Sequence, residues 1–220
     1  MRRRCGVGSR LAVLWSLTIA VGLLLAVGCS SRPTSPSQAA IRRVVVLGDS
    51  LSVAPSPDLA FPSILQTRIR QESLPWTVSD AGVWGDTTAG GLNRVDPLLA
   101  GDVGVLVLEL GANDGLEGVD TSTISGNLST IIERAQGHAI RVLLCGMETL
   151  PLHGLDYSLD FHSVFPNVAA KYSLPLVPFL LEGVVGRPSM LGPDGIHPNA
   201  AGAQRIADNV WPYLIPLLRP

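Results

Sequence analysis

The sequence predicts an α/β fold, a three-layer α/β/α sandwich with a five-stranded parallel sheet. Short apolar, β-branched runs alternate along the chain with longer segments whose apolar residues recur every three or four positions. The short runs are apolar on both faces, which is typical of parallel strands covered by helices on each side. No internal repeat is visible, and residues 41–218 are long enough for a single domain with a sizeable core.

Five apolar runs are the predicted strands, because each is short, rich in β-branched residues and followed by turn residues. They are residues 44–47, 77–78, 103–110, 140–145 and 176–177. Five longer segments with helical spacing are the predicted helices, and they cover residues 59–72, 89–99, 121–136, 158–171 and 200–218.

The composition excludes several classes of protein. Hydrophobic residues make up 46% of the chain and charged residues 15%, which favours a packed globule over a disordered chain. The first 28 residues hold four basic and no acidic residues, so the remainder has 12 basic against 18 acidic ones, a net charge of −6. Such a surface does not fit nucleic acid, and we expect no nucleic-acid partner.

The first 40 residues have the pattern of an export signal followed by a tether. Arginines precede an apolar stretch, residues 11–27, that ends in small residues before Cys29, and residues 29–40 are rich in serine and proline. Residues 1–28 are similar to the signal peptide of bacterial lipoproteins, which implies a lipid-modified Cys29 and an exported protein anchored at the cell envelope. Ordinary cleavage and an uncleaved anchor are the alternatives. Cys145 has no expected disulfide partner and is predicted to pack as a small apolar residue.

Polar side chains follow three of the predicted strands, and a further pair precedes the last helix. Ser50 lies in Gly-Asp-Ser-Leu after the first strand, Gly85 in a glycine-containing loop after the second, and Asn113 in Gly-Ala-Asn-Asp after the third. Asp194 and His197 lie in Asp-Gly-Ile-His-Pro. Since ligands of such sheets bind beyond the carboxyl ends of the strands, we expect these side chains to meet there.

These residue types are the parts of an acyl-transfer site. A serine hydroxyl needs a base to remove its proton, and the base needs a third group that fixes its tautomer, which are the roles expected of Ser50, His197 and Asp194. The negative charge on the carbonyl oxygen needs hydrogen-bond donors. The candidates are the backbone N–H groups of Ser50 and Gly85 and the side-chain amide of Asn113.

The four sequence blocks, in this order, resemble the SGNH (GDSL) hydrolase family, and the chain is similar to its bacterial thioesterase I, lysophospholipase and arylesterase branch. The resemblance implies a flavodoxin-like fold, Ser50 as nucleophile, Gly85 and Asn113 as oxyanion donors, and the Asp194–His197 pair. It implies a monomeric hydrolase of small acyl esters without a cofactor. Trp84 stands where the family often has a small residue, which makes acyl-length preference an open question.

Simpler interpretations exist for each residue. Ser50 also suits a helix cap, and Asn113 a turn. His138, His153 and His162 lie in no cluster with ligand spacing, so we assign no metal. Two other functions keep the same fold: an O-acetyl esterase acting on cell-envelope glycans, and a catalytically silent lipoprotein that binds at the envelope.

Overall fold

The structure is a computed structural model that describes residues 41–219. The predicted signal peptide, the tether and Cys29 lie outside the described residues. Five parallel strands form one sheet in the order β2-β1-β3-β4-β5, which confirms the predicted sheet. The strands are β1 (Arg42–Gly48), β2 (Trp76–Asp80), β3 (Val103–Glu109), β4 (Arg141–Cys145) and β5 (Leu176–Val177).

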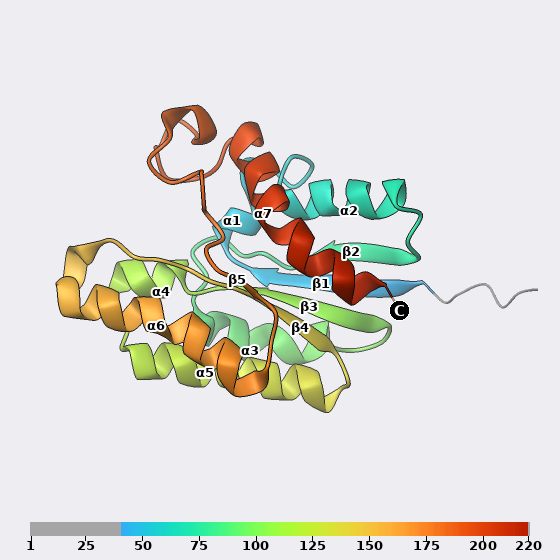
Figure 1. Ribbon diagram of the computed structural model, residues 1–220, viewed down its shortest axis with the longest axis horizontal. Coiled ribbons are helices and arrows are strands. Elements are labelled where there is room, and N and C mark those ends of the chain that lie inside the picture. Colours follow the sequence, from blue (N-terminus) through green and yellow to red (C-terminus); the bar gives the residue numbers. More distant parts are fainter. Residues whose placement is uncertain (1–40, 220) are drawn as a thin grey trace, which may run out of the picture. The chain divides into compact units, whose positions relative to one another are not determined.

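Helices cover both faces of the sheet, so the predicted three layers are present (Figure 1). One face carries α2 (Phe61–Gln71) and α7 (Ala200–Leu218), which pack against each other. The other face carries α3 (Thr88–Leu98), α5 (Thr121–Gly137) and α6 (Leu155–Tyr172), with α5 between its two neighbours.

Four short elements complete the described chain. The helices α1 (Ser50–Val53) and α4 (Ala112–Glu117) directly follow β1 and β3, and the 3-10 turns η1 (Pro151–His153) and η2 (Pro188–Met190) lie in later loops. The sequence did not predict α1 or α4, since one or two turns are too short to show an apolar periodicity.

The core explains why the strands form where they do. Every residue of β3, the central strand, is buried, and β1 is buried from Val44 onward, so both strands are covered on two faces. Cys145 ends β4 and is fully buried, and this burial raises the pKa of its thiol well above the ordinary value. The thiol is therefore apolar filling, as predicted. Within residues 41–219, no helix combines the length and the apolar character that crossing a bilayer requires.

Candidate active site

Ser50 is the first residue of α1, at the carboxyl end of the buried strand β1. The carboxylate of Asp49 caps this helix by accepting a hydrogen bond from the backbone N–H of Leu51 at 2.8 Å. The strand-to-helix turn is tight: a Cβ on Gly48 would lie 2.3 Å from Glu109 Oε2. Ser50 is only 6% exposed, so its hydroxyl is held in place by buried backbone on both sides.

Hydrogen bonds connect Ser50, His197 and Asp194 in one chain. His197 Nε2 lies 2.9 Å from Ser50 Oγ, and His197 Nδ1 lies 2.6 Å from Asp194 Oδ2. The other carboxylate oxygen of Asp194 accepts hydrogen bonds from the backbone N–H groups of Ile196 and His197, both at 3.0 Å. These bonds, above all the one to the imidazole, lower the pKa of Asp194 from 3.8 to about 2.

The loop that carries His197 is anchored to the start of α7. Asn199 caps α7 by accepting hydrogen bonds from the N–H groups of Ala201 and Gly202. Its amide nitrogen donates to the carbonyl oxygens of Ser189 and Leu191, each at 3.0 Å. The imidazole is thus positioned by a loop that the helix itself holds.

Gly85 lies in a turn in which the N–H of Asp86 donates to the carbonyl oxygen of Val83 at 3.1 Å. Its φ of +71° is in the left-handed region, which glycine adopts without steric cost. A Cβ at this position would meet nothing within 4 Å, so the space beside the backbone is open.

Asn113 connects the loops of Ser50 and Gly85. Its side-chain nitrogen donates to Asp49 Oδ2 at 3.1 Å and to the carbonyl oxygen of Asp86 at 2.8 Å. It lies in the first turn of α4, so it is not the simple turn residue considered above. The structure therefore brings the predicted residues to the carboxyl ends of β1, β2 and β3.

Arg94 is a supporting residue that sequence reasoning missed. Its guanidinium donates to Asp86 Oδ2 at 2.7 Å and to the carbonyl oxygens of Ala81 and Gly48 at 2.6 and 2.9 Å. It joins the Gly85 loop to the end of β1 in this way. The residue lies in α3, where an arginine in the sequence resembles any solvated side chain, so no local signal could have identified it.

Two acidic residues brace the loops. Asp49 caps α1, and the buried Asp114 accepts hydrogen bonds from the N–H of Thr88 at 2.9 Å and from its hydroxyl at 2.5 Å. Thr87 caps α3 through its hydroxyl, which accepts from the N–H of Gly90. The loop that contains Gly85 is consequently fixed at both ends.

Two carboxyl groups, those of Asp49 and Glu109, are fully buried close to Ser50. Glu109 Oε2 accepts a hydrogen bond from the backbone N–H of Asp49 at 3.2 Å, whereas Glu109 Oε1 is buried without a partner among the described residues. Burial raises the pKa of Glu109 well above its ordinary value, and burial raises the pKa of Asp49 from 3.8 to about 7. Both groups therefore bind more protons in the folded protein than in the unfolded chain between pH 5 and pH 8.

The raised pKa values of Asp49 and Glu109 predict that the free energy of unfolding falls as the pH rises. The unfolded chain binds fewer protons than the folded one above the ordinary carboxyl pKa, so unfolding becomes easier from pH 5 to pH 8. Glu109→Gln removes one of the two groups, and we expect it to reduce the fall in Tm over this interval by about 3 °C or more. Melting curves followed by circular dichroism measure this. The exposed Glu117 offers the matched control Glu117→Gln, and parallel wild-type and Glu109→Gln curves would contradict the expectation.

Trp84 contacts the imidazole of His197. The two ring centroids lie 4.7 Å apart with planes inclined by 58°, and Trp84 is 60% exposed. Such aromatic pairs contribute about 0.5–1.5 kcal/mol. We expect Trp84→Ser to lower kcat about 2- to 10-fold on a p-nitrophenyl ester, and Trp84→Phe to keep most of the activity. Val83→Ser changes the exposed neighbour and is the control; equal losses in all three variants would show that the ring contact is immaterial.

The other histidines serve structural contacts. His153 Nε2 lies 2.9 Å from the carbonyl oxygen of Leu116, His162 Nδ1 lies 2.7 Å from Glu148 Oε1, and His138 ends α5. Within residues 41–219, no group of three or more His, Cys, Asp or Glu side chains is placed to hold a metal ion.

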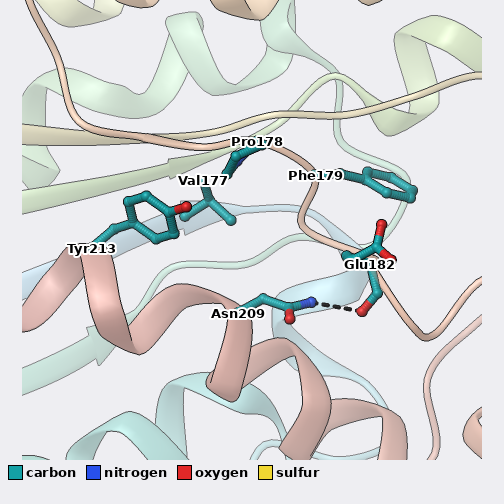
Figure 2. Close-up of a pocket in the computed structure, with 6 residues that line it drawn as sticks. All are labelled: Val177, Pro178, Phe179, Glu182, Asn209 and Tyr213. Carbon is teal, nitrogen blue, oxygen red and sulfur yellow. Dashed lines mark hydrogen bonds between the residues drawn. The ribbon is translucent and has the colours of Figure 1, made fainter.

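A pocket lies away from these residues, between the segment after β5 and α7. It has a volume of about 220 Å³. Figure 2 shows its walls and the hydrogen bond that Asn209 donates to the carbonyl oxygen of Glu182, at 2.9 Å. None of the predicted site residues lines it; the lining consists of Val177, Pro178, Phe179, Glu182, Asn209 and Tyr213.

Known proteins are similar to this chain in both sequence and fold. The GDSL-like Lipase/Acylhydrolase family matches residues 46–205. The chain is 41% identical over 198 residues to Esterase TesA of Pseudomonas aeruginosa, covering 89% of this chain and 98% of the relative. It is 33% identical over 183 residues to "Thioesterase 1/protease 1/lysophospholipase L1" of Escherichia coli, covering 82% and 86%.

Solved structures of similar proteins have the same fold as this chain. The crystal structure of TesA superposes with a TM-score of 0.77 at 40% identity, covering 80% of this chain and all of the other. The family match includes the blocks around Ser50, Gly85, Asn113 and Asp194–His197. The relative named Esterase TesA is covered over nearly its whole length. Both findings lead to the same assignment. The chain belongs to the GDSL-like lipase and acylhydrolase family and is an ester hydrolase.

Proposed function

We propose that the protein hydrolyses small acyl esters by a two-step mechanism in which Ser50 becomes acylated. The observation that carries this proposal is the hydrogen-bonded chain from Ser50 Oγ through His197 to Asp194, at 2.9 and 2.6 Å. A hydroxyl, an imidazole and a carboxylate at these distances can pass a proton from the nucleophile to the base as attack occurs.

In the first step Ser50 Oγ attacks the ester carbonyl while His197 Nε2 accepts the hydroxyl proton. The tetrahedral intermediate collapses, the leaving alcohol takes that proton from His197, and an acyl-enzyme remains. In the second step a water molecule attacks the acyl group while His197 Nε2 takes its proton. The tetrahedral intermediate then collapses, the imidazolium returns that proton to Ser50 Oγ, and the acid is released. The ionised Asp194 keeps the hydrogen of His197 on Nδ1, so Nε2 is free to accept a proton in each step.

Gly85 and Asn113 are the proposed donors to the oxyanion, with the backbone N–H of Ser50. The open space beside Gly85 allows an acyl group to approach its backbone, and the Asn113 nitrogen lies within 3.1 Å of the loops that carry Ser50 and Gly85. A donor of this kind contributes roughly 3–4 kcal/mol of transition-state stabilisation.

The substrates we propose are short and medium acyl esters, aryl esters, lysophospholipids and acyl thioesters. Apolar side chains that are unusually exposed stand next to the site in sequence: Val83 and Trp84 precede Gly85, and Ile196 precedes His197. A second group lies around α4, η1 and the start of α6, and η1 contacts α4 through His153, whose Nε2 lies 2.9 Å from the carbonyl oxygen of Leu116. An acyl chain that leaves the site toward α4 would meet these surfaces, formed by Leu116, Leu150, Leu152, Leu155 and Leu159.

We propose further that the enzyme is exported and acts at the cell envelope, anchored through a lipid on Cys29 and a tether over residues 29–40. The sequence pattern of residues 1–28 supports this location. Coenzyme A esters are poor candidates for the physiological substrate at such a site, which favours oxygen esters such as lysophospholipids.

Hydrolysis of a p-nitrophenyl series from acetate to palmitate tests the proposal, using protein that lacks residues 1–29. We expect turnover with a maximum at short or medium chains, and labelling by a fluorophosphonate that mass spectrometry locates on Ser50. No turnover on any ester, or a label on another residue, would refute the acyl-enzyme mechanism. Metabolic labelling of the full-length chain with palmitate, beside Cys29→Ser, separately tests the anchor.

A further inference from the structure

We infer that Asp49 is a positioning residue for the oxyanion donor Asn113, in addition to capping the helix that starts with Ser50. This inference deepens the proposed function and rests on it. Asp49 is fully buried, and each of its carboxylate oxygens has one distinct partner. Oδ1 accepts from the N–H of Leu51 at 2.8 Å, and Oδ2 accepts from Asn113 Nδ2 at 3.1 Å.

The orientation of the Asn113 amide is fixed by its hydrogen-bond partners. An amide side chain has a donor end and an acceptor end of nearly equal shape, so its partners decide its orientation. Both bonds of the Asn113 nitrogen go to acceptors: Oδ2 of Asp49 and the backbone carbonyl oxygen of Asp86, which can never donate. A flipped amide would place its own oxygen against both of them, so the NH₂ group is held toward the Ser50 and Gly85 loops.

The two hydrogens of that NH₂ group are both engaged. Both already have acceptors, at 3.1 Å in Asp49 and 2.8 Å in Asp86. An oxyanion can therefore be bound only by sharing a hydrogen with one of them. The bond to Asp49 is the longer one and is the one that yields, so the carboxylate orients the donor without holding it fully.

The hydrogen bond between Asn113 and Asp49 is strong enough to affect the rate. Hydrogen bonds contribute about 0.5–3 kcal/mol, the upper part of the range when the acceptor is charged, which corresponds to roughly 2- to 150-fold in rate if the bond is lost only in function. The carboxylate has no solvent to replace this partner, because Asp49 is buried against Glu109, whose side chain accepts from the Asp49 backbone at 3.2 Å.

A double-mutant cycle tests the inference. Asp49→Asn keeps an oxygen for the Leu51 cap but presents a second NH₂ group to Asn113, which favours the flipped amide. We expect kcat on p-nitrophenyl butyrate to fall about 10- to 100-fold with KM changed less than about twofold, since an oxyanion contact is made only in the transition state. Asn113→Ala is expected to lower kcat about 10²- to 10³-fold. If Asp49 acts through Asn113, the double variant equals Asn113→Ala within about twofold.

Three results would overturn or redirect the inference. If the two losses multiply, Asp49 acts independently of Asn113 and the inference is wrong. If the wild-type protein has no esterase activity, the proposed function itself has failed, which is a different outcome. If Asp49→Asn does not fold in a thermal melt, Asp49→Ser takes its place in the cycle, because serine still caps α1 but is too short to reach Asn113.

Asp120 offers the matched control. Its carboxylate caps α5 by accepting from the N–H groups of Ser122 and Thr123, the same chemistry as Asp49 at α1 but in a helix without a site residue. Asp120→Asn is expected to leave kcat unchanged. A loss in kcat equal to that of Asp49→Asn would show that a weakened cap, and not the link to Asn113, explains the effect.

Discussion

Ser50→Ala is expected to lower ester hydrolysis by a factor on the order of 10⁶, to the limit set by contaminating activity. The hydroxyl lies 2.9 Å from His197 Nε2, and without it no acyl-enzyme can form on Ser50. The variant should still fold, because Ser50 contributes a buried hydroxyl but no helix cap, which Asp49 supplies. Rates of p-nitrophenyl butyrate hydrolysis and a thermal melt of both proteins measure the two effects.

Ser52→Ala is the control for this experiment. Ser52 lies in the same short helix and its hydroxyl donates to the carbonyl oxygen of Asp49 at 3.0 Å, away from His197. We expect it to retain activity within about tenfold, the cost of one ordinary hydrogen bond. A Ser50→Ala protein that binds an ester, beside a wild type without turnover, would instead favour the silent envelope-binding lipoprotein.

Asp194→Asn is expected to lower kcat about 10³- to 10⁴-fold. An amide at this position can present its NH₂ group to His197 Nδ1, which stabilises the tautomer with the hydrogen on Nε2, the wrong nitrogen for a base. The side chain is 48% exposed, so the substitution leaves little strain behind and the effect is on chemistry. Steady-state kinetics on p-nitrophenyl butyrate measure it, with Asp208→Asn on α7 as an exposed control.

The pH dependence separates Asp194 from the other ionisable groups. Its pKa of about 2 lies below the ordinary 3.8, so the carboxylate is ionised at every pH above about 4 and any contribution to folding stability is lost only as the pH falls toward 2. A fall in activity between pH 8 and pH 5 must therefore come from another group. A loss of less than tenfold in Asp194→Asn would mean that other contacts hold the His197 tautomer.

The general rule for parallel sheets predicted most of the site. Ser50 and His197 are 147 positions apart, yet both were expected at the carboxyl edge of the sheet, and the 2.9 Å contact places them there. Side chains with distinctive chemistry that follow strand ends were recognisable in the sequence. Arg94 was not recognisable, because it lies within a helix. The buried pair of Asp49 and Glu109 was not recognisable either, because their hydrogen bond depends on the register between β1 and β3.

The ring contact between Trp84 and His197 shows the same limit. The sequence indicates that a bulky residue precedes Gly85, but only the path of two loops decides that its indole lies against the imidazole at 4.7 Å. Short helices such as α4 were missed for a related reason, since their formation depends on contacts with α6 and the sheet and not on a local pattern.

The anchoring of the His197 loop by Asn199 has a consequence for protein synthesis. Ser50, Gly85 and Asn113 all lie within the first 113 residues, but His197 follows β5 and its loop is supported by α7 (Ala200–Leu218). A nascent chain grows from its N-terminus and folds as it emerges. The growing polypeptide therefore contains Ser50 without its neighbouring imidazole until the segment that carries His197 and α7 has been made and folded.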